Sequence, residues 1–253
     1  LVSLAVTIIT LFLLNMLIGK VIRNTRQLST AANRLAAGHF DEPLSAAGDD
    51  EIGHLVQNFN SMSEKIKNGV QLQKTLLLAG EIQQRLLPQS GYFSEGIKAS
   101  GFSISCDETG GDFFDITPQK PGLLFLSVGD VVGHGVGAAL LMATIRATLR
   151  SEIQHSSNLA DCISKVNTLL CRDTAQSGDF ATLFLLSYCE ENRVLRWVRA
   201  GHEPGLLYCV DGNRFIELKG KGVALGVVKS IQYAEYTYKL QAGKHLLFIG
   251  SDG

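Results

Sequence analysis

Two aspartates flanked by glycine are the residues best suited to chemistry in this chain. Asp112 lies in GGDFFD and Asp130 in GDVVGHG, and the apolar runs Phe113–Thr117 and Leu123–Val128 between them predict two short strands joined by a turn at residues 118–122. Each aspartate would stand at a strand end, where a cation such as Mg²⁺ or Mn²⁺ can approach the carboxylate and a neighbouring backbone carbonyl together. A single Gly-Asp pair, however, more often forms a turn, because both residues favour turns for local hydrogen-bonding reasons.

A third aspartate, Asp252, follows the predicted strand His245–Ile249 and also has a glycine neighbour. Carboxylates gathered at one edge of a sheet repel one another and are costly to bury unless cations neutralise them. Two divalent ions ~3.5–4 Å apart would resolve this conflict, and such a pair can bind phosphoryl oxygens, generate hydroxide at neutral pH and stabilise a leaving oxygen. The pattern therefore predicts a phosphatase in which Asp112 and Asp130 are catalytic.

The elements that must position these aspartates are predicted beyond Gly91. Short connections between several strands favour a largely antiparallel sheet in an α+β domain. The other predicted strands are Phe102–Cys106, Ala181–Cys189, Val194–Ala200, Leu206–Val210, Phe215–Leu218 and Ala234–Leu240. Apolar residues on one side predict two helices, Gly137–Gln154 and Leu159–Arg172.

The beginning of the chain predicts a membrane span. Leu1–Gly19 is uncharged, and its length as a helix nearly matches the ~30 Å hydrocarbon core of a bilayer. A signal peptide is disfavoured, because no basic region precedes this run and no small-residue cleavage pattern follows it. Since Lys20, Arg23 and Arg26 follow at once, the positive-inside tendency places everything after Gly19 in the cytoplasm.

Two helices are predicted next. Lys20–Ala37 carries an apolar stripe and ends at Gly38, and a linker follows it. The second helix begins where Asp49 offers an N-cap. Its apolar residues recur with spacings of three and four, which is typical of a coiled-coil seam and favours partner helices; they are Ile52, Leu55 or Val56, Phe59, Met62 and Ile66.

A transmitter helix is predicted over Gln71–Leu87, ended by Pro88. Its seam residues are Leu72, Leu76, Ala79, Ile82 and Leu86. Gly69 and Gly80 weaken it, since glycine in a helix interior costs about 1 kcal/mol relative to alanine. We expect this helix to be metastable unless it packs against something, and to change register when a signal arrives.

Charge and cysteine content exclude other classes of protein. The formal net charge is −1 and no concentrated basic face is present, so we expect no nucleic-acid partner. The cysteines are odd in number and lack CxxC spacing, which predicts small buried hydrophobes in a reducing compartment rather than a zinc site. They are Cys106, Cys162, Cys171, Cys189 and Cys209.

The segment Lys20–Lys67 resembles the HAMP signal-transmitting module. The resemblance rests on a membrane span, a basic first helix, a linker that opens GHF, and DDEIGHLVQNFNSMSEKI, with Glu51, Phe59 and Asn60 in the expected places. One departure is that Thr25 lies near the place of a proline often found early in the first helix. The resemblance implies a homodimer in which two helices from each chain form a parallel four-helix bundle.

The segment Gln71–Gly253 is similar to the SpoIIE-type branch of the metal-dependent PPM serine/threonine phosphatases. The motifs are AGEIQQRLLPQ, E-x-GGDFFD, GDVVGHG, GDFATLFL, AGHEP and SDG, in that order. The resemblance implies an αββα sandwich with two Mn²⁺ or Mg²⁺ ions at one end. It also implies that Asp112, Asp130 and Asp252 are metal ligands, that Val131 contributes a backbone carbonyl, and that a metal-bridging water attacks phosphoserine or phosphothreonine.

Some features depart from the phosphatase pattern. The chain starts at Leu1 without a methionine and stops at Gly253 directly after an apolar strand, so we expect a fragment cut at both ends. The family's last metal-binding aspartate should lie beyond Gly253, so we expect an incomplete site and doubtful activity. Val132 stands where the wider superfamily can have a histidine general acid. His134 either lies near the site or caps or orients the glycine loop, and we expect His202 to support the site rather than to catalyse. Two further aspartates are expected to be structural, Asp115 and Asp179.

The resulting prediction is a membrane-anchored phosphatase of a bacterial inner membrane. It comprises a transmembrane helix (1–19), a HAMP domain (20–70), a transmitter helix (71–90) and an incomplete PPM-type domain (91–253). The resemblance implies that its substrate is a phosphorylated regulatory protein similar to an anti-anti-sigma factor. One alternative is a catalytically degenerate domain that binds a phosphoprotein. A diguanylate cyclase, suggested by GGDFF, is disfavoured because Gly91–Thr109 leaves no room for its upstream residues.

Overall fold

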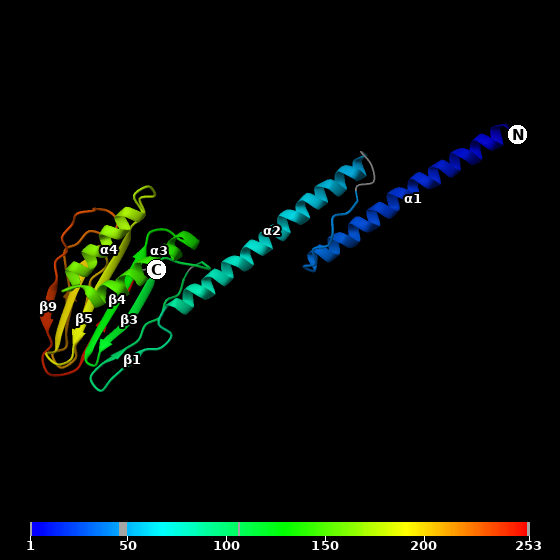
Figure 1. Cartoon of the computed structure of the whole chain (residues 1–253). Helices are drawn as coiled ribbons and strands as arrows, with labels where there is room; N and C mark the ends of the chain where they lie inside the picture. The colour runs from blue at the N-terminus through cyan, green and yellow to red at the C-terminus, as the bar shows by residue number, and fades with distance from the viewer. Residues whose placement is uncertain (1, 46–49, 106, 252–253) are drawn as a thin grey trace. The chain divides into compact units, whose positions relative to one another are not determined.

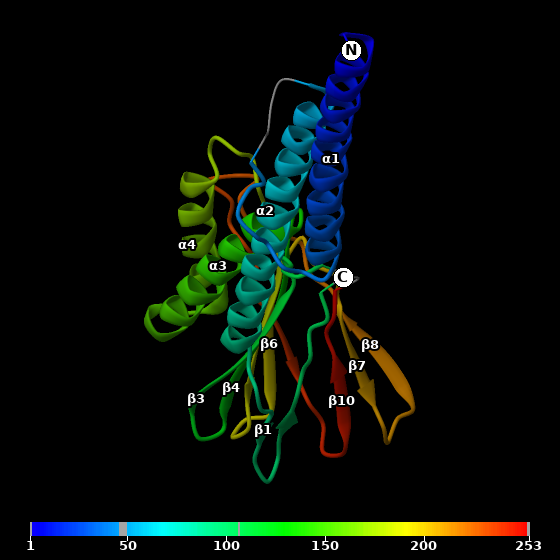
Figure 2. The ribbon, with the colours of Figure 1, turned by 90° about the vertical axis from the view of Figure 1, so that its right-hand side faces the viewer.

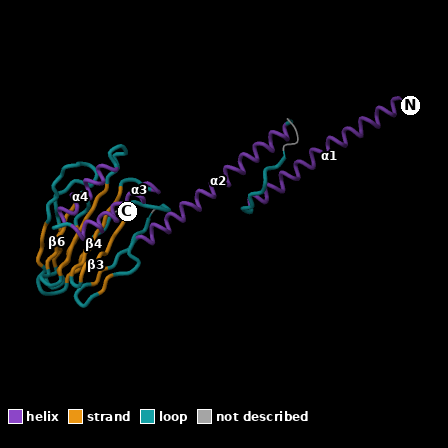
Figure 3. The backbone as a smooth tube through the Cα atoms, in the orientation of Figure 1, coloured by secondary structure: helices purple, strands orange, loops and turns teal. Residues whose placement is uncertain are grey.

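The computed structural model describes residues 2–45, 50–105 and 107–251, and its chain divides into two compact units, Leu1–Thr75 and Leu76–Gly253. The first unit is helical among its described residues, and the strands gather in the second (Figures 1 and 3). This combination confirms the predicted α+β fold class. Each unit is described by itself below.

Helix α1 (Val2–Ala36) contains the predicted membrane span and the predicted first HAMP helix without a break. Its segment Ser3–Ala36 is long and apolar enough to cross a membrane, as judged from length and composition. Hydroxyl groups inside the helix, such as those of Thr7 and Thr10, donate to carbonyls four residues earlier. Such bonds leave no hydroxyl proton unpaired, which suits an apolar surrounding.

Helix α2 (Glu51–Leu86) joins the predicted second HAMP helix to the predicted transmitter helix. Its N-cap is Asp50, whose Oδ1 accepts a hydrogen bond of 2.8 Å from the Gly53 amide. The predicted cap, Asp49, lies outside the described residues. Asn60 holds the connector between the helices, because its side chain donates to the Leu44 carbonyl at 2.8 Å and accepts from the Leu44 amide at 3.0 Å.

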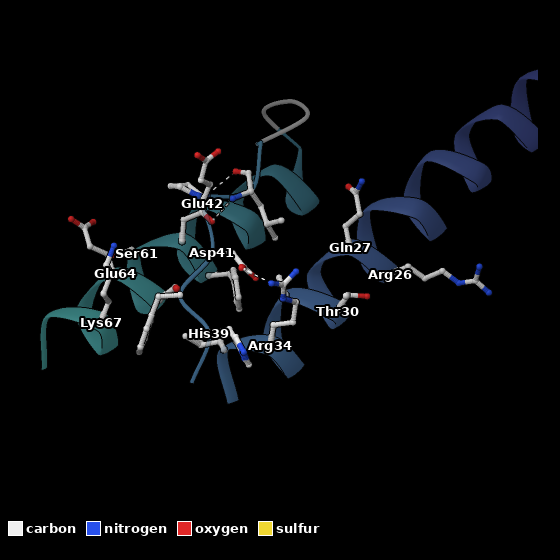
Figure 4. A pocket seen from close by; sticks show the side chains of 18 of the residues that line it. Arg26, Gln27, Thr30, Arg34, His39, Asp41, Glu42, Ser61, Glu64 and Lys67 are labelled. Atoms are coloured by element: carbon white, nitrogen blue, oxygen red, sulfur yellow. Dashed lines mark hydrogen bonds and ion pairs between the residues drawn. The ribbon is translucent and has the colours of Figure 1, made fainter. Parts of the chain in front are cut away.

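A pocket of about 1120 Å³ lies between α1, the connector and α2 within the first unit. Figure 4 shows Arg34 of α1 turned toward Asp41 of the connector, with which it forms an ion pair of 2.9 Å. Three side chains of the predicted seam, Leu55, Met62 and Ile66, are exposed in the single chain. The parallel bundle with a second copy therefore stays a prediction, and these side chains are the ones that it would cover.

The second unit contains two main sheets and a small hairpin. The five-stranded sheet has the order β3-β4-β5-β6-β9 and is antiparallel throughout, with strands Phe113–Lys120, Leu123–Val131, Ala181–Cys189, Val194–Ala200 and Tyr236–Lys239. The three-stranded sheet has the order β10-β7-β8, visible side by side in Figure 2, with strands His245–Phe248, Gly205–Cys209 and Arg214–Leu218. The hairpin consists of β1 (Tyr92–Phe93) and β2 (Lys98–Ala99).

Two cores lie on opposite faces of the five-stranded sheet. Helices α3 (Gly135–His155) and α4 (Leu159–Asp173) cover one face, and the three-stranded sheet covers the other. Strand β5 shows the division most clearly, since Leu183 and Leu185 enter the helix-side core while Phe184 and Leu186 enter the core between the sheets. The described residues from 91 onward thus supply one helix layer and both sheets of the predicted sandwich.

Two local predictions were wrong. Phe102 and Ile104 belong to no strand and are 85% and 78% exposed, because a strand needs a pairing partner and the described chain offers none to residues 101–105. The last residue of that predicted strand, Cys106, lies outside the described residues. Pro118 does not begin the turn but continues β3 to Lys120 through an irregular register. Proline is tolerated there because β3 is an edge strand.

Candidate metal and catalytic site

Asp112 and Asp130 lie at the same end of the five-stranded sheet. In the antiparallel pairing of β3 and β4, Phe113 stands opposite Gly129. Because antiparallel partners shift by one residue in opposite directions, continuing this register places Asp112 opposite Asp130. The structure thus brings together two of the predicted site residues from different strands.

The backbone carbonyl of Val131 lies against the loop that carries Asp112. A Cβ atom added to Gly111 would come within 2.3 Å of the Val131 oxygen, so only glycine allows this approach. The Val131 side chain is buried in the helix-side core and the residue pairs with Ala181 of β5, which holds its backbone in place. The Val131 main-chain oxygen, predicted as a further ligand, therefore lies against the residue that precedes Asp112.

The electrostatics of this sheet end favour a cation. The Asp112 Oδ1 is buried and has no hydrogen-bond partner among the described residues. A buried carboxylate oxygen without a partner is costly, and an oxygen-preferring cation is one way to satisfy it. Asp112 also borders a pocket of about 1110 Å³ that is lined by residues of both sheets.

The metal site is not complete within the described residues. No group of three or more His, Cys, Asp or Glu side chains among them is arranged to hold a metal ion. Asp252, the remaining predicted ligand, lies outside the described residues. The donors that the structure places together are two carboxylates and a carbonyl oxygen, which are the ligand types that Mg²⁺ and Mn²⁺ prefer.

His202 lies behind this aspartate pair rather than at the surface. It is 3% exposed, and its Nδ1 is 2.8 Å from the hydroxyl of Thr182, the residue opposite Asp130 in β5. Burial lowers the pKa of His202 from its ordinary value, and the Gly250 carbonyl, Glu203 and Asp112 act in the opposite direction. This surrounding favours a neutral ring that fixes Thr182, in keeping with the supporting role predicted for it.

His134 occupies the N-cap position of α3 but makes no capping bond with its side chain. The ring is 85% exposed, and its Nδ1 lies 3.2 Å from Oδ2 of Asp107. The GHG loop is instead held by backbone bonds, including one from the Gly135 amide to the Thr109 carbonyl. These contacts agree with orientation of the glycine loop through Asp107 and not with capping, while a place for His134 near the site stays a prediction.

Asp115 faces away from the aspartate pair and toward α3. Its carboxylate accepts hydrogen bonds from Arg150 at 2.5 and 2.7 Å and from Arg146 at 3.2 Å. Asp115 is 3% exposed, so both arginines neutralise a buried charge. These contacts agree with the structural role predicted for it.

Gln83 near the end of α2 is a functional candidate that the apolar pattern did not predict. Its side chain is buried and bonds to the main chain of Gly110, two residues before Asp112. The sequence does hold one signal: Gly80 lies one helical turn earlier, and a glycine inside a helix often marks a close backbone approach.

Three comparisons with known proteins bear on this arrangement. The family described as Stage II sporulation protein E (SpoIIE) matches residues 120–253, more than half of the chain, and this range includes Asp130, Val131 and Asp252. The HAMP domain matches residues 16–68.

Relatives support the same family. Phosphoserine phosphatase RsbU of Bacillus subtilis (strain 168) is 24% identical over 197 residues, which cover 78% of this chain and 56% of RsbU. Protein IcfG of Synechocystis sp. (strain ATCC 27184 / PCC 6803 / Kazusa) is 27% identical over 260 residues, which cover 87% of this chain and 40% of IcfG. The chain thus spans about half the length of the curated relatives that it matches.

A solved structure supports the fold. The SiaA-PP2C domain of Pseudomonas aeruginosa has a TM-score of 0.55 and 21% identity, and the match covers 69% of each chain. The matched ranges agree with the ordered motifs and with the two aspartates at one end of the sheet. The chain therefore belongs to the SpoIIE family and carries a HAMP domain on the N-terminal side of its SpoIIE segment.

Proposed function

We propose that this protein is a membrane-anchored, metal-dependent phosphatase that removes phosphate from phosphoserine or phosphothreonine of a regulatory protein. The single observation that carries the proposal is the buried Asp112 Oδ1, which has no hydrogen-bond partner within residues 2–45, 50–105 and 107–251, at the sheet end that Asp130 shares. A structural aspartate would be paired, as Asp115 is. A buried oxygen that finds no partner in the described part of the chain suits a site that is completed by a cation.

The metal site would consist of Asp112, Asp130, the Val131 carbonyl and Asp252, with two Mn²⁺ or Mg²⁺ ions. Bound ions would supply charge neutralisation at the phosphoryl oxygens and a more acidic water. The residues of this chain would fix the spacing of the ligands. Strand pairing sets the distance between Asp112 and Asp130, and the close approach at Gly111 sets the position of the Val131 oxygen.

The proposals for the substrate and the signalling role rest on the relatives. RsbU is named as a phosphoserine phosphatase, which supports phosphoserine as the substrate class. We propose a substrate similar to an anti-anti-sigma factor, a homodimer formed through the HAMP domain, and an inner-membrane location with the residues after Gly19 in the cytoplasm. The domain limits proposed are 1–19, 20–70, 71–90 and 91–253.

The second candidate is a phosphoprotein-binding module that shares the fold but does not hydrolyse. It is worth testing because the described residues alone do not complete a metal site. The cyclase alternative has lost its support, since the SpoIIE family accounts for the segment that follows GGDFF.

Hydrolysis and binding can be separated in the full-length protein with a phosphoserine protein substrate. With Mn²⁺, we expect turnover in the wild type and a loss of at least about 100-fold in Asp130→Ala, because loss of a direct ligand should exceed the 10–100-fold typical of outer contacts. Asp173→Ala, an exposed aspartate at the end of α4, is the matched control and should keep its activity. Equal turnover in Asp130→Ala would sink the metal-site proposal, whereas tight binding without turnover in the wild type would establish the binding module.

A further inference from the structure

The last turns of α2 belong to the second unit, and one face of them packs against the rest of that unit. Gly80, Gln83 and Leu87 are buried, and Leu87 joins the helix-side core, while the neighbouring Ile82 and Gln84 are exposed. Ile82 is a member of the predicted seam, which stays a prediction because no second copy is present to cover it. This buried face contains a glycine and a polar amide, so it makes polar and backbone contacts in addition to apolar ones.

The Gln83 amide forms two hydrogen bonds with one residue of the loop before β3. Its Nε2 donates to the Gly110 carbonyl at 2.6 Å, and its Oε1 accepts from the Gly110 amide at 3.2 Å. These two bonds hold the peptide groups on both sides of the Gly110 Cα, so they restrict both the position and the orientation of this residue. Because Gln83 is only 6% exposed, breaking these bonds leaves buried polar groups without water to replace them.

A second contact lies one turn earlier in the helix. A Cβ atom added to Gly80 would come within 2.0 Å of the Glu108 carbonyl oxygen. The helix backbone therefore touches the loop at Glu108 and holds it again at Gly110. Two points of attachment mean that a rotation of α2 about its axis must displace this loop or break the contacts.

The loop attached in this way is the one that ends at the candidate site. Gly110 precedes Gly111, which lies against the Val131 carbonyl, and Asp112 follows directly. Resting on the function proposed above, we infer that Gln83 is a positioning residue that sets the metal affinity of the site by holding Asp112 opposite Asp130. Helix α2 runs without a break from Glu51, within the segment that matches the HAMP domain, to Leu86.

The inference can be tested by replacing Gln83 in the full-length protein in detergent micelles. Gln83→Met keeps the size of the side chain and removes both bonds, and Gln83→Glu keeps an acceptor for the Gly110 amide. Mn²⁺ affinity, measured from the paramagnetic resonance signal of free Mn²⁺, should fall about 10–100-fold in Gln83→Met and less in Gln83→Glu. Gln84→Met, on the exposed side of the same turn, is the matched control and should bind Mn²⁺ as the wild type does.

A second measurement is independent of metal. Hydrogen exchange of the peptide 107–113, followed by mass spectrometry, should accelerate in Gln83→Met and stay unchanged in Gln84→Met. Wild-type Mn²⁺ affinity and wild-type exchange in both Gln83 variants would overturn the inference. If Gln83→Met does not fold, Mn²⁺ affinity and hydrogen exchange are compared between Gln83→Glu and Gln84→Met, and wild-type values in Gln83→Glu would likewise overturn the inference. A wild-type protein that binds Mn²⁺ without hydrolysing the phosphoprotein would instead contradict the proposed function and leave the positioning role measurable.

Discussion

The ion cluster of Asp115, Arg146 and Arg150 allows a sharp test of which aspartate in GGDFFD is structural. Asp115→Ala removes all three hydrogen bonds from the arginines and leaves Arg146, whose side chain is 9% exposed, as a buried charge without its carboxylate. Arg150 is 44% exposed and can turn to water, so the loss falls mainly on Arg146. Burial already lowers the pKa of Arg146, and Asp115 is the group that opposes this effect.

The expected loss of stability in Asp115→Ala follows from the burial of this ion pair. Removing one partner of a buried ion pair costs about 3–5 kcal/mol. In a unit of this size, 1 kcal/mol shifts the melting temperature by roughly 2–4 °C, so Asp115→Ala should lower it by roughly 6–20 °C. Mn²⁺ affinity below the transition should stay within about twofold of the wild type, because Asp115 faces α3 and not the aspartate pair.

Chemical denaturation and thermal unfolding measure the first effect, and Mn²⁺ titration measures the second. In a double-mutant cycle, Arg146→Met should restore part of the stability lost in Asp115→Ala, since it removes the unpaired charge. A melting temperature within 2 °C of the wild type, or a large loss of Mn²⁺ affinity at full stability, would refute the structural assignment of Asp115.

Three further predictions rest on single contacts. Gly111→Ala should weaken Mn²⁺ binding at least about 10-fold, because its Cβ would come within 2.3 Å of the Val131 oxygen, whereas Gly137→Ala meets no atom within 4 Å and should stabilise α3 by roughly 0.5–1 kcal/mol. Asn167→Ala should lower the free energy of unfolding by roughly 2–4 kcal/mol in a denaturant titration, since its fully buried amide bonds two backbone groups of the loop 226–228. Burial raises the pKa of Cys162 to about 12, so an unfolded thiol releases its proton first as the pH rises. Stability should therefore be complete below about pH 8.5 and fall above it by up to ~1.4 kcal/mol per pH unit, a slope that Cys162→Ala should remove.

Each of these has a contrary outcome. Unchanged Mn²⁺ binding in Gly111→Ala would show that the Val131 oxygen is no ligand. A loss below 0.5 kcal/mol in Asn167→Ala, with unchanged hydrogen exchange at 226–228, would show that the loop is held by other contacts. A fast reaction of Cys162 with a thiol reagent in the folded protein at pH 8 would contradict its burial.

The fold was predictable where short-range patterns decide it. Strands β5 and β6 begin and end at the predicted residues, because their apolar runs are bounded by turn-forming and charged residues. Asp112 and Asp130 were predicted to lie at strand ends, and the register places them opposite each other. The segment Phe102–Cys106 has the composition of a strand, yet pairing depends on a neighbouring edge that composition does not reveal.

Long-range polar contacts were not predictable in the same way. The partners of Asp115 lie 31 and 35 residues away on α3, and Gln83 finds Gly110 across 27 residues. No periodicity marks such pairs, since each depends on how separate elements come together in space. The transmitter helix gives an example: Gln83, which its apolar stripe does not include, is buried, while Ile82, a member of that stripe, is exposed in the single chain.

Strand β5 has a consequence for how the protein avoids aggregation. Both of its faces enter a core, so the run Ala181–Cys189 has no charged residue and no proline, which is the composition of a segment prone to cross-β assembly when exposed. The run is preceded by Asp179 and followed by Glu190 and Glu191, charges that discourage stacking of one such strand on another. Until β4 and β6 pair with its two edges, these three carboxylates oppose association of this strand with the same strand of another chain.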